Sequence, residues 1–308
     1  MIMGQQRDAA TTDRIVNAMT VDVEEYFHVT AFDGVVPRSR WDTLESRVCA
    51  TTDRVLRILD DAGVSGTFFV LGCVAERHPD LVRRIAAQGH EIASHGYAHR
   101  LVYDQTPAAF RADVVRAKAI LEDASGTPVL GFRAPSYSIT PRSLWAFDVL
   151  IETGHVYDAS IFPIHHDRYG IPVSPREAYV ITRDAGSLVE VPATTCRWAG
   201  WNLPVGGGGY FRLLPYAWTR FGIDRVNRVE RRPAIFYIHP WELDPEQPRL
   251  PCGLLSRVRH YRNLHLTEGR LRRLLRDFRF APLRATVSAL PRSRPERLST
   301  AYALPYLW

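Results

Sequence analysis

Two carboxylates stand at the end of the first apolar run in the chain. Residues 18–23 have the pattern of a strand, and Asp22 and Glu24 lie two positions apart at its end. Because the side chains of a strand alternate between its faces, we expect both carboxylates on one face and Val21 and Val23 in apolar packing. Neighbouring carboxylates repel each other, which favours a cation close to them. From this segment alone, a strand end with solvated acids is an equally good interpretation.

Two histidines follow a second predicted strand, residues 91–94. His95 and His99 stand four positions apart in the segment SHGYAH, and Gly96 permits a tight bend between them. Two imidazoles at this spacing can converge on one ion in a helix or in a turn. The pattern is weak alone, but its place directly after a strand matches that of the acidic pair. One carboxylate and two imidazoles leave positions open for water and substrate, as a catalytic metal requires.

A third histidine ends the predicted strand at residues 234–238. His239 is followed by Pro240 and Trp241, which make a rigid turn and offer an aromatic ring on which a sugar can stack. An isolated histidine in this position is more often a hydrogen-bonded core residue than a catalytic one.

Arg133 follows the predicted strand at residues 129–132. From there its guanidinium can hold a carboxylate such as Asp22 ionised and in place. Taken alone, the segment fits an exposed arginine equally well.

The apolar runs that carry these residues alternate with amphipathic segments, which favours a parallel sheet, either open or closed into a barrel. Such folds keep their sites at the carboxyl ends of the strands. The predicted helices cover residues 52–62, 75–87, 106–123, 142–153 and 267–276. The predicted strands cover residues 18–23, 67–71, 91–94, 129–132, 156–158, 188–191, 234–238 and a last strand near 280–287.

The 308 residues, with 46% hydrophobic and 23% charged side chains, are those of an ordinary globular protein and fit one α/β barrel. We expect a single domain over residues 15–289, with an insertion at about 200–232 after roughly the sixth strand. Residues 1–14 and 290–308 are expected to be loose ends.

Composition excludes several classes of protein. The net charge is +6, but the basic residues are scattered and no nucleic-acid motif is present, so we expect no nucleic-acid partner. The four cysteines form no CxxC pair and fit free thiols. No secretory leader and no apolar run of about 18 residues is seen, so we expect no membrane-spanning segment and a cytoplasmic location. The oligomeric state is not indicated.

Together these segments resemble the polysaccharide deacetylases of the NodB-homology type, the fourth carbohydrate esterase family. The order matches over about residues 15–285: an acidic strand, SHGYAH, RAPSY, a strand with YDAS, and IHPWE. The chain is most similar to a subgroup associated with bacterial exopolysaccharide clusters. That similarity rests on VDVEEYF, on GGGGYFR at residues 206–212, on HYRNL at residues 260–264, and on the FRFAPL segment.

The resemblance implies a distorted (β/α) barrel and a divalent metal, most often zinc, with cobalt or nickel as alternatives. It implies that Asp22 is the catalytic base, that Arg133 orients this base, and that His239 is the catalytic acid. His95 and His99 resemble the two imidazole ligands of the metal.

One position departs from the usual pattern of two adjacent aspartates, because Val23 follows Asp22. The resemblance to a variant branch with an Asp-x-Asp pattern points to Glu24 as the third ligand, and the same-face argument agrees. Glu25 remains an alternative. Asp158, through a looser alignment, is a candidate for tuning His239.

Aromatic and rigid residues beside these motifs are candidates for binding sugar: Tyr97, Pro135, Tyr137, Tyr210 and Trp241. The implied activity is metal-dependent hydrolysis of N-acetyl groups from amino sugars of a bacterial glycan, either an exopolysaccharide or its biosynthetic intermediate, with release of acetate. Two other hypotheses stay open. One is an amidohydrolase for a small non-sugar amide or ureide, and the other is a catalytically silent glycan-binding protein.

Overall fold

The computed structural model describes residues 15–32, 34–289 and 293–296. The expected loose ends at 1–14 and 290–308 lie outside the described residues, apart from one short strand. The strands are β1 (Val16–Val23), β2 (Thr67–Val70), β3 (Glu91–Ser94), β4 (Gly131–Phe132), β5 (Tyr157–Asp158), β6 (Tyr179–Arg183), β7 (Gly186–Glu190), β8 (Thr195–Trp198), β9 (Trp201–Pro204), β10 (Ile235–Ile238), β11 (Arg279–Ala281) and β12 (Ser293–Glu296). The α-helices are α1 (Val48–Asp61), α2 (Gly72–Arg77), α3 (Pro79–Ala87), α4 (Pro107–Ser125), α5 (Ala146–Glu152), α6 (Gly208–Leu213), α7 (Tyr216–Arg228), α8 (Leu254–Tyr261), α9 (Leu264–Asp277) and α10 (Leu283–Ala289).

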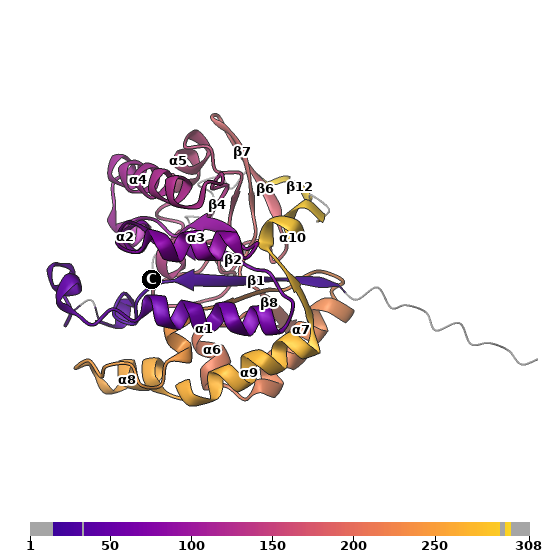
Figure 1. The fold of residues 1–308 in the computed structure, drawn as a ribbon. Coiled ribbons are helices and arrows are strands. Elements are labelled where there is room, and N and C mark those ends of the chain that lie inside the picture. Colours follow the sequence, from indigo (N-terminus) through magenta and orange to yellow (C-terminus); the bar gives the residue numbers. More distant parts are fainter. Residues whose placement is uncertain (1–14, 33, 290–292, 297–308) are drawn as a thin grey trace, which may run out of the picture.

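The central sheet has the strand order β10-β1-β2-β3-β4-β5-β7-β6-β12, and β11 also pairs with β1. Every pairing in this sheet is parallel except the antiparallel hairpin of β6 and β7, while β8 and β9 form a separate hairpin. Figure 1 shows α1, α6 and α9 on one side of β1, and α2 to α5 on the other. The sheet curls into an incomplete barrel, so the expected fold class is confirmed.

Helices and apolar side chains cover the central strands. In β1 every residue after Val16 is buried, and β2, β3 and β10 are buried throughout. This burial explains why the strands read as apolar runs rather than as alternating patterns, as is usual for parallel sheets covered by helices. The polar residues at their carboxyl ends are therefore the exception that marks the site.

Local sequence signals place the predicted elements, and proline accounts for two differences. The helix expected at residues 75–87 is broken into α2 and α3, because Pro79 has no N–H for the helix ladder and starts the second helix instead. The strand expected near 280–287 was wrong beyond its start. β11 ends at Ala281, and Pro282 opens α10, accepting hydrogen bonds from the N–H groups of Ala285 and Thr286.

Residues 200–232, expected to be an insertion, form β9, α6 and α7. Phe211, Ile223 and Val226 from this segment are buried in the main hydrophobic core with β1, β2 and β10. The segment is therefore packed into the barrel wall. No helix in the described part of the chain is both long enough and apolar enough to cross a membrane.

Candidate active site

Glu24, His95 and His99 converge just beyond the carboxyl ends of β1 and β3. One ligand atom from each lies within 4.8 Å of the others, and all three residues are buried. Glu24 Oε2 faces His99 Nε2 at 2.9 Å but receives no hydrogen bond from any described residue. A buried carboxylate oxygen without a donor, beside two imidazoles, is the environment that a divalent cation satisfies. These three residues can therefore hold a metal ion.

The orientation of His95 suits it for binding a metal ion. Its Nδ1 lies 2.7 Å from the carbonyl oxygen of Arg133, and because a carbonyl only accepts, Nδ1 carries the proton. Nε2 is then left with a free lone pair. Burial lowers the pKa of His95 to about 4, which keeps the ring neutral as a metal ligand must be.

The alternative ligand, Glu25, points away from this cluster. Its carboxylate accepts hydrogen bonds from Ser46 Oγ at 2.5 Å and from the backbone N–H of Arg47 at 3.0 Å. Glu24, by contrast, has its pKa held well below the usual range. Burial alone raises it, but the imidazoles of His99, His239 and His95 together outweigh burial. Geometry thus favours Glu24 of the two glutamates.

Asp22 lies beside the cluster and pairs with Arg133. The distance between Asp22 Oδ1 and Arg133 Nη1 is 2.6 Å, and both side chains are buried. The guanidinium is fixed further by Thr20 Oγ1 at 2.9 Å and by the carbonyl of Ala159 at 3.2 Å, and it lies 4.1 Å above the ring of Phe69. Because Arg133 is held on several sides, it fixes the position of Asp22.

His239 approaches the same centre from β10. Its Nε2 lies 3.9 Å from Asp22 Oδ2 and 3.7 Å from Glu24 Oε1. On the other side of the ring, Nδ1 lies 2.7 Å from Glu242 Oε1, which also accepts the backbone N–H of His239 at 3.0 Å. Burial alone lowers the pKa of His239, but Glu24, Glu242 and Asp22 raise it to about 9.

Glu242 is held in turn by Arg212, whose Nε lies 2.5 Å from Glu242 Oε2. Arg212 comes from α6 and is buried, and its remaining N–H groups donate to the carbonyls of Arg259, His260 and Arg262. Arg212 and His239 lower the pKa of Glu242 to about 2, although burial opposes them. The carboxylate is therefore ionised and fixed against His239.

Asp158, expected as the carboxylate that tunes His239, is not its partner. Asp158 is fully buried and accepts hydrogen bonds from the hydroxyl of Ser160 at 2.6 Å and from its backbone N–H at 3.2 Å. Its nearest acid is Glu190, and burial raises the pKa of both carboxyl groups, so that the pair retains a proton. Glu242 occupies the place at His239 that we had expected Asp158 to take.

A cleft of about 240 Å³ opens above these residues. Asp22, Glu24, His95, His99 and His239 all line it. The other residues that line its wall are Val29, Thr30, Tyr103, Ala134, Ser136, Tyr137, His166, Arg168, Tyr169, Arg212, Tyr237, Trp241, Ser256, Arg259 and His260.

Two of the five expected sugar-binding residues, Tyr137 and Trp241, line the cleft. The indole of Trp241 packs parallel to His260, with ring centroids 4.3 Å apart, and its Nε1 donates to Glu24 Oε1 at 3.0 Å. Trp241 thus orients the candidate metal ligand as well as lining the wall.

The other three expected residues do not line the cleft. The hydroxyl of Tyr97 donates to Glu76 at 2.6 Å, and the Arg116 guanidinium lies 3.7 Å above the tyrosine ring. Pro135 is buried, and Tyr210 is a half-buried residue that packs with Tyr169 against the aromatic cluster of the cleft wall. Proximity to a motif in sequence did not predict the direction of these side chains.

The family model described as polysaccharide deacetylase matches residues 40–150, and a domain of unknown function, DUF3473, matches residues 159–288. A chitooligosaccharide deacetylase of Bradyrhizobium sp. (strain ANU 289) is 32% identical over 99 residues, which are 32% of this chain and 43% of that protein. A peptidoglycan-N-acetylglucosamine deacetylase of Bacillus cereus is 33% identical over 96 residues, 31% of this chain and 35% of that protein. Over residues 40–150 the chain is therefore similar to the polysaccharide deacetylase family. The matched segments span less than half the length of these relatives.

Solved structures share the fold of this chain. A Mycobacterium smegmatis protein assigned to the polysaccharide deacetylases has a TM-score of 0.57 at 21% identity, covering 91% of this chain and 94% of that one. The Puue allantoinase has a TM-score of 0.56 at 17% identity, covering 87% and 86%. The two likenesses are nearly equal, so the fold alone does not separate the two activities.

Each of the two matched segments supplies part of the site. The segment that matches the polysaccharide deacetylase model supplies His95, His99 and Arg133. The domain of unknown function supplies His239 and its partners Glu242 and Arg212. Asp22 and Glu24, at the end of β1, lie in neither matched segment, and β1 pairs with β10 of the second segment.

Sequence reasoning missed Glu242 and Arg212. For Glu242 a signal was present, because a glutamate three positions after a strand-ending residue, with proline between them, is the pattern of a capping box, and the structure forms one here. For Arg212 no local signal exists, because its partner lies 30 positions away in the chain.

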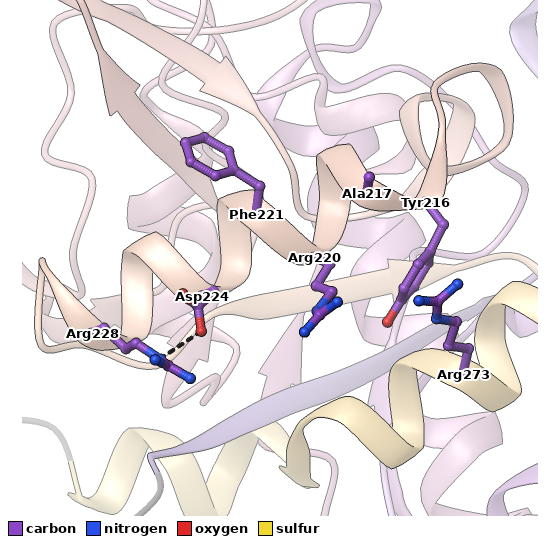
Figure 2. A pocket seen from close by; sticks show the side chains of 7 residues that line it. All are labelled: Tyr216, Ala217, Arg220, Phe221, Asp224, Arg228 and Arg273. Atoms are coloured by element: carbon purple, nitrogen blue, oxygen red, sulfur yellow. Dashed lines mark ion pairs between the residues drawn. The ribbon is translucent and has the colours of Figure 1, made fainter.

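A second pocket lies between α7 and α9 and is separate from this site (Figure 2). It is lined by Tyr216, Ala217, Arg220, Phe221, Asp224, Arg228 and Arg273. Its arginines pair with acids: Arg228 with Asp224 at 2.7 Å, and Arg220 with Asp277 at 3.6 Å. The Glu24, His95 and His99 cluster lies in the other cleft, at the carboxyl ends of the strands.

Proposed function

We propose that this chain is a metal-dependent hydrolase that removes N-acetyl groups from amino sugars of a bacterial glycan. One observation carries the proposal. Asp22 and His239, a fixed carboxylate and an imidazole with raised pKa, face each other across the Glu24, His95 and His99 cluster in one cleft. A base, an acid and a set of metal ligands at one point are what hydrolysis of an amide requires.

Glu24, His95 and His99 are the residues that would hold the metal. One carboxylate and two imidazoles suit zinc best and also accept cobalt or nickel. When bound, a divalent ion supplies Lewis acidity that polarises the acetyl carbonyl and makes nearby water more acidic. Three protein ligands leave room for substrate, as is usual in catalytic rather than structural sites.

Asp22 acts as the general base. Arg133 pairs with it and holds it at the cleft, so it can take the proton of the water that attacks the acetyl carbon. As the C–N bond breaks, protonated His239 donates the proton on Nε2 to the departing nitrogen. Water and the N-acetyl sugar thus give acetate and a free amine. Asp22 and the acetic acid formed each give up a proton, one proton returns to His239 through solvent, and one proton is released in total.

Glu242 and Arg212 prepare His239 for this role. Glu242 accepts from Nδ1, which leaves the Nε2 proton directed towards the reacting centre. Arg212 holds Glu242 in place from α6. A carboxylate behind the imidazole also stabilises its protonated form, which a general acid at neutral pH needs.

The substrate class rests on the relatives. The Bradyrhizobium protein is named for chitooligosaccharides and the Bacillus cereus protein for peptidoglycan N-acetylglucosamine, so an N-acetylglucosamine unit is the shared element. We propose the same unit for this chain. An exopolysaccharide or its biosynthetic intermediate is the glycan in which we expect it to occur.

The test is acetate release from N-acetylglucosamine oligomers by metal-stripped protein, with and without added zinc, cobalt or nickel. Restored release supports the proposal, and H95A serves as the control that should stay inactive with every metal. Allantoin is assayed in parallel. Turnover of allantoin without release of acetate from the oligomers would favour the ureide hypothesis, and metal binding without either activity would favour a silent glycan-binding protein.

A further inference from the structure

Two guanidinium groups from distant parts of the chain line the cleft beside the catalytic centre. Arg168 lies in the loop between β5 and β6, and Arg259 lies on α8. Both belong to the wall of the cleft that holds Asp22 and His239. Burial lowers the pKa of His166, another residue of this wall, and the positive charges of Arg259 and Arg168 lower it further. The two positive charges therefore stand near one point of the cleft.

Within the described part of the chain, no acid neutralises either charge. Arg168 Nη1 donates to Thr30 Oγ1 at 3.2 Å, and the side chain of Arg259 donates to none of the described residues. No described carboxylate lies within 4 Å of either guanidinium. Asp167, the acid next to Arg168 in the chain, pairs with His166 Nδ1 at 2.9 Å. Both arginines are exposed to the cleft mouth and free to bind a ligand.

The pocket between α7 and α9 shows the opposite arrangement. There Asp224 neutralises Arg228, and Asp277 lies 3.6 Å from Arg220 and 3.9 Å from Arg273 (Figure 2 shows the first pair). Guanidinium groups lining that pocket are thus engaged by the protein itself, whereas the pair in the catalytic cleft is left open.

We propose that Arg168 and Arg259 form a subsite for an anionic group on the substrate, so that the enzyme prefers N-acetylated sugars joined to a carboxylate or a phosphate. This inference rests on the proposed deacetylase function. Guanidinium presents a planar fork of donors that matches both kinds of anion. The subsite selects glycans with an acidic neighbouring sugar or a phosphate-linked carrier over neutral oligomers.

The experiment compares three substrates with the same reacting unit. They are a neutral N-acetylglucosamine oligomer, an oligomer that alternates N-acetylglucosamine with glucuronate, and UDP-N-acetylglucosamine. For each, kcat and KM are measured on metal-loaded protein. We expect kcat/KM to be about tenfold or more higher for at least one anionic substrate, mainly through KM, and the advantage to shrink with added salt. Comparison of the glucuronate oligomer with UDP-N-acetylglucosamine shows whether the subsite prefers a carboxylate or a phosphate.

Variants assign the preference to the two arginines. In R168Q and R259Q the ratio of anionic to neutral kcat/KM should fall, and in the double variant it should approach one. R257Q is the matched control, because Arg257 is an exposed arginine on the same helix as Arg259 but does not line the cleft. The proposal would be overturned if the unaltered enzyme had the same kcat/KM for all three substrates. It would also be overturned if R257Q lost as much of the preference for anionic substrates as R168Q and R259Q do.

Binding separates this proposal from the activity on which it rests. Titration calorimetry with N-acetylglucosamine 1-phosphate and with the glucuronate oligomer needs no turnover. Tighter binding of these anions than of the neutral oligomer, lost in the double variant, supports the subsite even if no acetate is released. Equal binding of all three ligands would contradict it even if the enzyme deacetylates the neutral oligomer.

Discussion

Glu242 Oε1 lies 2.7 Å from His239 Nδ1, and the same oxygen accepts the backbone N–H of His239 at 3.0 Å. The short turn that begins at Pro240 brings these two residues together, three positions apart. A carboxylate on Nδ1 fixes the ring and its tautomer, so that Nε2 faces Asp22 and Glu24. The residue proposed as general acid is therefore prepared by its own turn, and not by Asp158, which accepts hydrogen bonds from Ser160 instead.

The substitution E242Q should move the alkaline limb of the pH profile to lower pH. The pKa of His239 is raised to about 9, because Glu24, Glu242 and Asp22 outweigh burial. A general acid works in its protonated form, so activity is present below this pKa and is lost as the pH rises through it. Glutamine keeps the size of the side chain but removes one negative charge. The pKa of His239 then falls. As the pH is raised, kcat/KM therefore begins to decline at a lower pH than in the unaltered enzyme.

The matched control is D158N, because Asp158 was the carboxylate expected from the sequence. Its hydrogen bonds go to Ser160, so its substitution should leave the alkaline limb in place. A shift of this limb in D158N with none in E242Q would reverse the assignment.

The parts of the site that the sequence predicted are those in which the position along a strand determines where a side chain points. Asp22 and Glu24 share a face because strand side chains alternate, and His95 follows a strand whose end is fixed by parallel pairing with β2. Tyr97 shows the limit. It stands two positions from His95, yet its ring turns to Glu76 and Arg116. Outside regular elements, tertiary contacts rather than spacing decide the direction.

Contacts between distant segments could not be predicted at all. Arg212 meets Glu242 across 30 positions, and the cleft mouth joins loops near residue 30 and residue 168 with α8. One chain without aligned homologues gives no signal for such pairs. The fold class was accessible because alternating strands and helices with short connections permit few arrangements.

The pair E24Q and E25Q should separate the metal ligand from its neighbour. Substitution of a residue that only supports a metal ligand typically lowers metal affinity by roughly 10–100-fold. In E24Q a direct ligand is weakened, so we expect metal affinity to fall by more than this. E25Q should retain the metal, because Glu25 is engaged by Ser46 and Arg47 away from the cluster. Competition with a chromogenic chelator measures both affinities. Equal loss in the two variants, with both proteins folded, would contradict the assignment of Glu24.

Arg133 should matter for stability as well as for positioning the base. In R133M the buried carboxylate of Asp22 loses its 2.6 Å partner, and an unpaired buried charge costs about 3–5 kcal/mol of folding free energy. Adding D22N removes that charge, so the double variant should be more stable than R133M alone. Urea unfolding followed by circular dichroism measures the difference. If D22N gave no recovery in the R133M background, the charge pair would not be the source of the loss.

H239A should spare the metal site and slow turnover. His239 lies 3.7 Å from Glu24 Oε1 and is not one of the three clustered ligands, so zinc affinity should change little. Loss of a general acid lowers kcat by about 10²–10⁴-fold. H265A, which removes an exposed histidine on α9, is the control for a surface change.

The leaving group gives a sharper version of the H239A test. An N-acetyl compound with an electron-poor aniline as leaving group needs less help from an acid when the C–N bond breaks. H239A should therefore lose less activity on this compound than on an N-acetyl sugar. The same loss on both would mean that His239 acts on the attack of water or on substrate binding, and full activity on the sugar would exclude it from catalysis.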